Sequence, residues 1–366
     1  MKKAMAAALL SMGCACPIWA QSSGAPGVQV YGLLDTGVEY IKGGGVSTTR
    51  LTSLSGGQFP SRLGFRGGED LGDGLGAVFA LEMGFGVDNG LLQQGGRSFG
   101  RQAYVGLSTG WGTFTVGRQY TMTYYSMFDA DVIGPAVFGA AALDPYLPQS
   151  RVDNSFAYRG TFGGLTLGAT YSLGRDVAMP GNCPGETGGS ACREWSAMVK
   201  YDTPGWGVAL AHDELNGGVS GNFFGQPVGT RPSADNKDRR TILNGYVRFG
   251  DAKIGAGWIK RKLSAAPVPL STDIYFIGVS YLVYGSFSVD AQLLALKDAR
   301  KDTDAKMVVI RGNYGLSRRT SVYAMVGHVW NERNAAYSIT ASELTAVPPG
   351  AGRGQSGVML GIRHSF

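Results

Sequence analysis

The chain has 366 residues and a formal net charge of +6, with basic and acidic residues spread along the sequence. This spread leaves no basic stripe of the kind that binds nucleic acid, so we expect no nucleic-acid partner. Glycine is abundant, with 58 residues, and tyrosine and phenylalanine recur without a helical period. The composition therefore predicts an all-β protein with many tight turns.

The N-terminal stretch has the layout of a secretory signal. Two lysines precede an apolar run, and Ala20 is a small residue before the expected cleavage point. We expect residues 1–20 to be a signal peptide and residues 21–366 to be the exported protein. A lipid anchor at Cys14 is the weaker alternative, because the residues before it make a poor lipobox. Beyond residue 20, no apolar run reaches the ~18 residues that a membrane helix needs.

Two cysteines remain after cleavage, Cys183 and Cys192, in a stretch rich in proline and glycine. In an exported chain we expect them to form a disulfide. Zinc is the weaker alternative, because His212, His328 and His364 are scattered and fit no ligand spacing. We expect no metal and no cofactor.

Alternating polarity predicts long strands throughout the exported chain. Seven short turns alternate with eight longer polar connections, so fifteen connections predict sixteen strands. Long strands in even number, with short turns at one end and long loops at the other, are the layout of a transmembrane β-barrel of the outer membrane. The long connections lie near residues 43–59, 88–98, 121–150, 175–192, 214–238, 262–272, 298–304 and 332–354.

Aromatic residues mark the end of the predicted barrel that carries the short turns. An aromatic girdle at the periplasmic interface is expected there. Two strands, at 273–282 and 320–330, are apolar on both faces, which leaves a subunit contact open for them. The aromatic residues beside the short turns are Trp111, Phe162, Trp206, Phe249, Tyr284 and Tyr314.

The connection Thr121–Gln149 is too long and too apolar for an unstructured surface loop. A segment of this kind packs against other parts of the protein, so we expect it to fold into the barrel and cover the inner wall. Its acids are expected to face arginines of neighbouring strands across a gap. The two sets are Asp129, Asp131 and Asp144 on the loop, and Arg101, Arg151 and Arg159 on the strands.

Five motifs follow one another along the exported chain and cover essentially all of it. They are Arg62-Leu-Gly-Phe-Arg-Gly-Gly-Glu69, Arg101-Gln-Ala-Tyr-Val-Gly-Leu107, Gly117-Arg-Gln-Tyr120, Arg151-Val-Asp-Asn-Ser-Phe-Ala-Tyr-Arg159 and Gly361-Ile-Arg-His-Ser-Phe366. In this order they resemble the general diffusion porins of Gram-negative bacteria, especially the β-proteobacterial type. The resemblance implies a homotrimer of sixteen-stranded antiparallel barrels in the outer membrane, surrounded by membrane lipid and lipopolysaccharide. Each barrel would form a water-filled channel for passive diffusion of ions and small hydrophilic solutes.

The resemblance also implies which residues form the basic side of a pore constriction. Arg62, Arg101 and Arg151 match the family's strand arginines, and Arg66 is an additional base. Glu82 is an acid of the wall, which we expect on the acidic side together with the loop acids. Arginine stays charged at any physiological pH. Clustered arginines opposite carboxylates in a narrow aqueous gap would create a transverse field.

The acidic side of the constriction is incomplete in comparison with the family. Asp131 matches an acid of the third loop, whereas Ala136 stands where the family has a second carboxylate. The constriction is therefore expected to be net positive, and the pore to prefer anions modestly.

Two other functions remain as alternatives. A solute-specific channel is left open by Tyr124, Tyr125 and Tyr146 in the long loop. An outer-membrane barrel enzyme would need a base beside a nucleophile, and the three histidines have no evident partner set. We therefore expect a channel without enzymatic activity.

Overall fold

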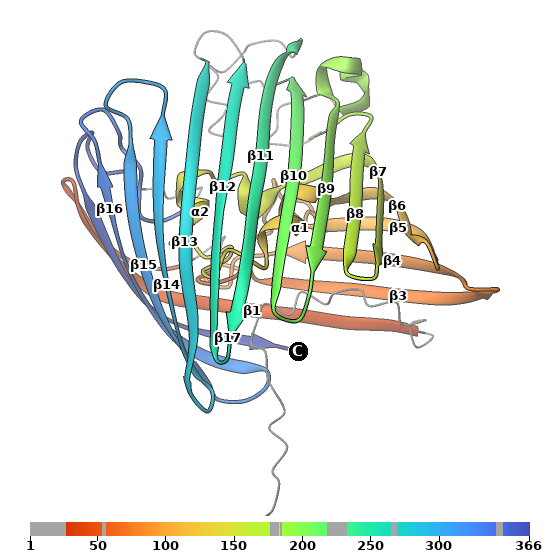
Figure 1. The fold of residues 1–366 in the computed structure, drawn as a ribbon, viewed down its shortest axis with the longest axis horizontal. Coiled ribbons are helices and arrows are strands. Elements are labelled where there is room, and N and C mark those ends of the chain that lie inside the picture. Colours follow the sequence, from red (N-terminus) through yellow and green to blue (C-terminus); the bar gives the residue numbers. More distant parts are fainter. Residues whose placement is uncertain are drawn as a thin grey trace, which may run out of the picture.

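The computed structural model describes residues 27–52, 56–175, 183, 185–217, 233–264, 269–341 and 347–366, which form a closed antiparallel barrel (Figure 1). The expected signal peptide, residues 1–20, lies outside the described residues. The first strand pairs with the last, from Leu33 opposite Ser365 to Lys42 opposite Ser356. Because the sheet closes on itself, the hydrogen bonds of its edges are satisfied within the barrel.

The described residues contain seventeen strands and four short helices. The strands are β1 Gly27–Gly43, β2 Val46–Leu51, β3 Arg62–Gly72, β4 Leu75–Gly84, β5 Gln102–Thr109, β6 Gly112–Tyr120, β7 Arg151–Phe162, β8 Leu165–Ser172, β9 Glu194–Asp202, β10 Trp206–Gly217, β11 Ser233–Phe249, β12 Ala252–Ser264, β13 Leu270–Tyr284, β14 Phe287–Asp298, β15 Ala305–Gly315, β16 Thr320–Asn331 and β17 Gln355–Ser365. The helices are α1 Met122–Met127, α2 Ala140–Leu143, η1 Leu147–Gln149 and η2 Gly185–Cys192. Within these ranges, no helix is long and apolar enough to span a membrane.

Two of the seventeen strands share one position in the barrel. The second half of β1 pairs with β2, and its first half pairs with β3 on the same side. The barrel therefore has sixteen strand positions, which confirms the predicted fold class. The prediction of a single long connection at 43–59 is wrong in part, because residues 46–51 form the strand β2. That segment is polar and short, so its alternation carries little apolar signal.

The segment between β2 and β3 is fixed to the inner wall by one buried carboxylate. Asp35, 1% exposed, accepts backbone N–H groups of Gly57, Gln58 and Phe59 at 3.0, 3.2 and 3.0 Å. The hydroxyl of Tyr323 donates to the same carboxylate at 2.6 Å. These contacts hold residues 57–59 against the inner wall. They separate β2 from β3, which pair with successive parts of β1.

The outward faces of the strands form an apolar surface. Val105, Leu293 and Leu360 are 61%, 57% and 64% exposed, as expected for side chains that contact lipid rather than a protein core. The six aromatic residues beside the short turns are all exposed, including Trp111 and Tyr284. Their exposure fits a girdle at the membrane interface.

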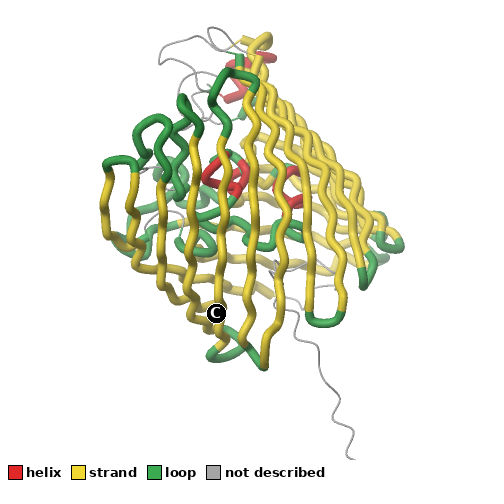
Figure 2. Tube along the Cα trace, turned by 60° about the vertical axis from the view of Figure 1, so that its left-hand side comes forward, coloured by secondary structure: helices red, strands yellow, loops and turns green. Residues whose placement is uncertain are grey.

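The core of the molecule lies inside the barrel, between the long loop and one part of the wall. We call residues 121–150 the inner loop; it joins β6 to β7, and its helices α1 and α2 lie within the ring of strands (Figure 2). Buried apolar side chains of the loop pack on inward side chains of β11–β17. This packing explains why the strands at 273–282 and 320–330 are apolar on both faces. The contacts join Ala130, Ile133, Val137, Phe138 and Leu143 of the loop to Ile242, Ile259, Phe276, Leu294, Met307 and Met325 of the wall.

Two wall glycines allow the inner loop to lie directly on the strands. A Cβ on Gly255 would stand 1.9 Å from the carbonyl oxygen of Ala130, and one on Gly278 would stand 2.5 Å from a methyl group of Val132. At Gly255 the loop backbone therefore lies directly on the wall backbone, and at Gly278 the Val132 side chain fills the space that a wall side chain would occupy.

Candidate pore constriction

The inner loop follows the barrel wall from β8 to β17 and then returns. Its first helix, α1, contacts β8–β11. Farther along, Arg311 of β15 donates to the carbonyl oxygens of Val132 and Ile133, both at 2.9 Å. Val137 then donates its N–H to the carbonyl of Gly57 at 3.0 Å, and its own carbonyl accepts from Ala341 at 2.8 Å. The loop is therefore tied to one side of the barrel, which we call the loop wall, the inner faces of β9–β17.

The remaining side of the lumen carries a group of arginines that we call the arginine wall. These are the arginines expected at the constriction, and they lie on or next to β3, β5 and β7. Arg101 lies within electrostatic range of both Arg62 and Arg151. The arginine wall comprises Arg62, Arg66, Arg101, Arg151 and Arg159.

Arg101 is paired with the wall acid Glu82. Its Nε donates to Oε1 of Glu82 at 2.6 Å, and both side chains are almost fully buried. Tyr31 donates to the other oxygen of Glu82 at 2.9 Å. Glu82 therefore lies among the arginines themselves, not on an opposing acidic face.

The other arginines of this wall contact aromatic rings or backbone. The guanidinium of Arg151 lies 5.0 Å from the Tyr120 ring centroid, and that of Arg159 lies 4.2 Å from the Tyr125 ring. Such cation–π contacts leave the positive charge in place. Arg62 donates Nε to the carbonyl of Pro60 at 3.2 Å. In the described parts of the chain, neither Arg62 nor Arg151 forms an ion pair with a carboxylate within 4 Å.

Arg66 lies farther along β3 than Arg62 and also contacts neutral groups. Its Nε donates to Oε1 of Gln29 at 2.8 Å, and its guanidinium lies 4.9 Å from the Tyr31 ring centroid. Arg66 therefore extends the positive surface beyond the group around Arg101.

The acids of the inner loop do not lie opposite the arginine wall. Asp144 accepts two hydrogen bonds from Arg240 of β11, at 2.7 and 3.0 Å, and both side chains are buried. Burial alone would raise the pKa of Asp144, but the nearby Arg240 and Arg261 hold its pKa below the ordinary value. Asp129 pairs with Lys200 of β9. Both acids therefore neutralise basic residues of the loop wall.

Asp131 also lies away from the arginine wall, so the expectation that it faces Arg62, Arg101 and Arg151 is wrong. It accepts the N–H of Gly134 at 2.9 Å and lies beside Gln292 and Arg311 of β14 and β15. The loop turns toward these strands because its apolar residues pack there, and this path carries Asp131 with it. Burial raises the pKa of Asp131 above its ordinary value, although these partners act in the opposite sense.

A second buried acid group, which was not among the predicted site residues, anchors the two ends of the inner loop. Asp213 of β10 accepts hydrogen bonds from Thr121, Thr123 and Tyr146 at 3.0, 2.8 and 2.6 Å. The Tyr146 hydroxyl also lies 3.0 Å from Glu194 of β9. The inward position of Asp213 in an alternating strand is the one sequence signal that could have singled it out.

The tyrosines of the inner loop do not form an open aromatic surface. Tyr124 is 6% exposed and stacks on Tyr120 with ring centroids 3.7 Å apart. The hydroxyl of Tyr146 donates a hydrogen bond to the buried carboxylate of Asp213. The inner loop therefore lies along the loop wall, and the arginine wall stands on the other side of the lumen.

The structure also shows the surroundings of Cys183, Cys192 and the three histidines. Cys183 and Cys192 form a disulfide, with Cα atoms 5.8 Å apart. The three histidines lie on outward strand faces, where each contacts a hydroxyl: His212 with Thr241, His328 with Ser356 and His364 with Thr320. Among the described residues, no group of three or more His, Cys, Asp or Glu side chains could hold a metal ion.

Comparisons with known proteins agree with this architecture. Residues 4–334 match the family described as Gram-negative porin. An outer membrane porin protein of Bordetella pertussis is 30% identical over 413 aligned residues, and the match covers 100% of both chains.

Solved structures give the same result. A structure described as an anion-selective porin from Comamonas acidovorans has a TM-score of 0.75 and 26% identity, covering 93% of this chain and 99% of the other. A trimer form of OmpT from Vibrio cholerae has a TM-score of 0.65, covering 94% of this chain and 100% of that one. Its 18% identity supports a common fold alone.

Proposed function

The chain belongs to the Gram-negative porin family and forms a passive diffusion channel in the outer membrane, and we propose that this channel prefers small anions modestly. The observation that carries the proposal is the unequal distribution of charge around the lumen. The arginine wall has five guanidinium groups beside the carboxylate of Glu82, and the nearby Asp153 of β7 is shared by two further arginines, Arg97 and Arg118. The loop acids Asp129 and Asp144 form their ion pairs on the other side.

This charge distribution acts on permeating ions through its electric field. Arg62 and Arg151 keep their charge without a carboxylate partner, and the barrel wall beside them is a medium of low dielectric constant. An anion that enters this region is attracted, and a cation is repelled. The similar porin from Comamonas acidovorans is described as anion-selective, which supports the same preference here.

We further propose that the inner loop sets the narrowest part of the channel. The loop lies inside the ring of strands and is fixed at its ends by Asp213 and along its length by Arg240 and Arg311. A loop held at so many points does not move aside easily, so it limits solute size sterically. This leaves a general channel for small hydrophilic solutes as the function that the geometry supports best.

The outward surface supports a membrane-embedded oligomer. We propose a homotrimer of these barrels, with the remaining outward apolar surface in contact with lipid and lipopolysaccharide. Heat-resistant oligomers on gels, converted by boiling to a species near the monomer mass, would be the expected result.

The experiment that tests the ion preference is a reversal-potential measurement in planar bilayers. The purified protein is inserted under a modest KCl gradient, and the zero-current potential is read for single channels. We expect the sign that corresponds to chloride passing more readily than potassium, and a smaller preference at about 1 M salt, where the Debye length is about 3 Å. A potential of the opposite sign would contradict the proposal.

A further inference from the structure

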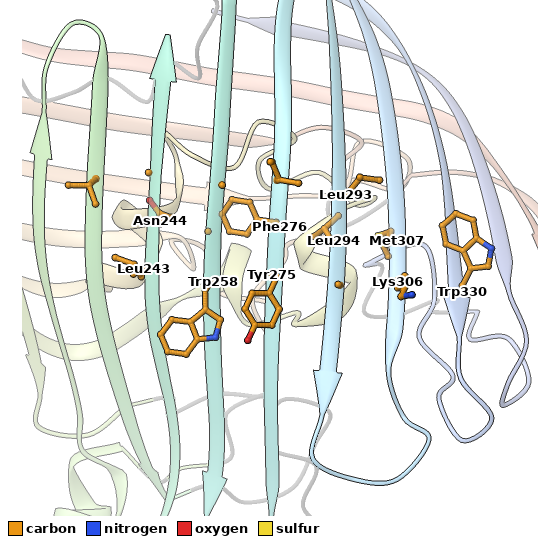
Figure 3. A pocket seen from close by; sticks show the side chains of 16 residues that line it. Leu243, Asn244, Trp258, Tyr275, Phe276, Leu293, Leu294, Lys306, Met307 and Trp330 are labelled. Atoms are coloured by element: carbon orange, nitrogen blue, oxygen red, sulfur yellow. The ribbon is translucent and has the colours of Figure 1, made fainter.

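A large and a small cavity in the described part of the chain differ in place and lining. The large one, of about 1140 Å³, lies on the wall formed by β10–β16 beside Trp258, Tyr275 and Trp330, whose rings belong to the outward surface (Figure 3). The small one, of about 40 Å³, lies inside the barrel, where the inner loop returns to Arg151 of the arginine wall. Because solutes pass through the lumen, the small cavity is the one that meets them. We call it the lumen recess.

The lumen recess has a polar side that contains a buried cation. Arg151 is 4% exposed and lines the recess together with Gln93, Gln94 and Gln149. The Nε atom of Arg151 has no hydrogen-bond partner among the described residues. Guanidinium groups bind carboxylates through parallel N–H donors, and these charge-assisted bonds are stronger than bonds between neutral groups. The polar side is therefore suited to a carboxylate.

The rest of the lining is apolar and comes from three segments of the chain that lie inside the barrel. Three of its six residues are prolines, which have no backbone N–H to offer a solute. Among the described residues that line the recess, none is acidic, and Ala136 beside it stands where the family has a carboxylate. The six residues are Pro60, Pro135, Val137, Ala141, Pro148 and Ala341.

Several backbone polar groups of this apolar side already have partners. Both the N–H and the carbonyl of Val137 form hydrogen bonds with neighbouring segments. The carbonyl of Pro60 accepts from Arg62 at 3.2 Å. The carbonyl of Pro148 accepts from Arg151 at 3.4 Å. A solute hydroxyl on this side would therefore lose water and gain few partners, whereas a solute methyl group would gain from leaving water.

The size of the lumen recess limits what it accommodates. A cavity of about 40 Å³ has room for roughly three water-sized groups, since one such group needs about 10–15 Å³. Pro135, Pro148 and Ala341 are only half-buried, so the recess opens to the lumen and is not sealed. A chain of about three carbon atoms fits this space while its carboxylate stays at Arg151.

We propose that the lumen recess favours, among the small anions that enter the pore, carboxylates with a short apolar chain over carboxylates that carry hydroxyl groups. The carboxylate lies at Arg151, and the chain lies against the apolar side. Arg151 alone would not distinguish two anions of equal size and charge, so the apolar side makes the selection. The inference rests on the proposed anion preference, which brings carboxylates into the pore.

The test compares isobutyrate with lactate, which have equal numbers of non-hydrogen atoms and differ by a methyl group in place of a hydroxyl. Single channels of the purified protein separate potassium chloride from the potassium salt of one carboxylate at equal concentration. The zero-current potential then gives the permeability of that carboxylate relative to chloride. We expect isobutyrate to be about threefold more permeant than lactate, somewhat less than the gain from full burial of one methyl group.

The apolar side is tested by Ala141→Ser with Ala341→Ser, which adds two hydroxyl groups to the recess and changes no charge. We expect this variant to bring the ratio of isobutyrate to lactate permeability close to one. The matched control is Ala142→Ser with Ala299→Ser, the same chemical change at two positions outside the lining, and it should keep the threefold ratio. Single-channel conductance in potassium chloride reports that both proteins are folded.

The polar side is tested by Arg151→Gln. This change should lower the permeability of both carboxylates relative to chloride, because a carboxylate uses parallel N–H donors and a chloride ion does not. Unchanged carboxylate permeability relative to chloride would place the carboxylate elsewhere and overturn the proposed binding mode.

Three further outcomes would overturn the inference. One is a ratio of isobutyrate to lactate permeability of one or less in the original protein. Another is a threefold ratio that persists in the variant of Ala141 and Ala341, since the selecting surface would then lie elsewhere. The third is loss of the ratio in the control variant. The preference for chloride over potassium is measured in the same channels: its absence contradicts the proposed function, whereas its presence with a ratio of one contradicts the inference alone.

Discussion

The two sides of the lumen use basic residues in different ways. On the loop wall, Arg240, Lys200 and Arg311 hold carboxylates or carbonyls of the inner loop, and apolar contacts surround them. On the arginine wall, Arg62 and Arg151 contact a carbonyl and an aromatic ring, and their charge is not neutralised by an ion pair. The same residue type thus fixes the loop on one side and, in our proposal, sets the field on the other.

Shortening the inner loop should have the largest effect on the pore, because it removes one of the two sides compared. Deleting residues 129–144 eliminates most of the segment that lies inside the barrel, so we expect a large rise in single-channel conductance and entry of larger sugars. The measurements are planar-bilayer conductance and liposome swelling with sugars of increasing mass. Unchanged values for both in folded oligomers would mean that the loop does not set the narrowest section.

Breaking one buried ion pair on the loop wall should have the next largest effect. Arg240→Met leaves Asp144 buried without its partner, and such a loss costs about 3–5 kcal/mol. We expect lower thermal stability and more open-channel current noise. The double change Arg240→Met with Asp144→Leu should recover part of the stability, because it leaves no single charge at that position. Equal stability of Arg240→Met and the original protein would show that the pair does not hold the loop.

A smaller effect should appear on acidification. The pKa of Asp131 is raised by burial, whereas that of Asp144 is held below its ordinary value by Arg240 and Arg261, so Asp131 takes up a proton first. A raised carboxyl pKa stabilises the folded form below that pKa and costs stability as the pH rises through it. The loop should therefore stay anchored while it loses one negative charge.

Reversal potentials measured between about pH 7 and pH 4 should accordingly show a small increase in anion preference. Asp131→Asn should remove this pH dependence. A pH step that persists in that variant would assign the titration to another group.

The smallest effect on the pore should come from the disulfide. Cys183→Ser with Cys192→Ser opens a short covalent loop, for which the entropic contribution is at most about 3 kcal/mol. We expect conductance and ion preference to stay unchanged, since the bond lies outside the arginine wall and the inner loop. Altered single-channel conductance in the double variant would contradict this.

The barrel could be predicted from the sequence because its signals are local. Alternating polarity and short turns recur along the chain, and each strand pairs with its neighbour in sequence. The exception is the connection expected at 43–59, where Asp35 fixes residues 57–59 and Tyr323 completes the contact. That interaction joins positions far apart in the chain, and no local pattern contains it.

The positions of the arginines could be predicted from the sequence, whereas the partners of the loop acids could not. The arginines lie at regular strand positions, so motif and alternation placed them on one side of the lumen. The partners of the loop acids depend on the path of the loop across the barrel: Asp144 meets Arg240, 96 residues later, and Asp131 lies beside Gln292 and Arg311. That path is set by apolar packing on β11–β17, which becomes apparent when the whole wall is assembled.

The most direct test of the account compares two charge-matched variants by reversal potential under the same KCl gradient. One carries Arg62→Gln and Arg151→Gln, the arginines without carboxylate ion pairs, and the other carries Arg318→Gln and Arg319→Gln in an exposed turn. We expect the first pair to remove most of the anion preference with a smaller change in conductance, and the second pair to leave the preference nearly intact. Equal shifts in the two variants would contradict this expectation, because the preference would then follow net charge and not the arginine wall.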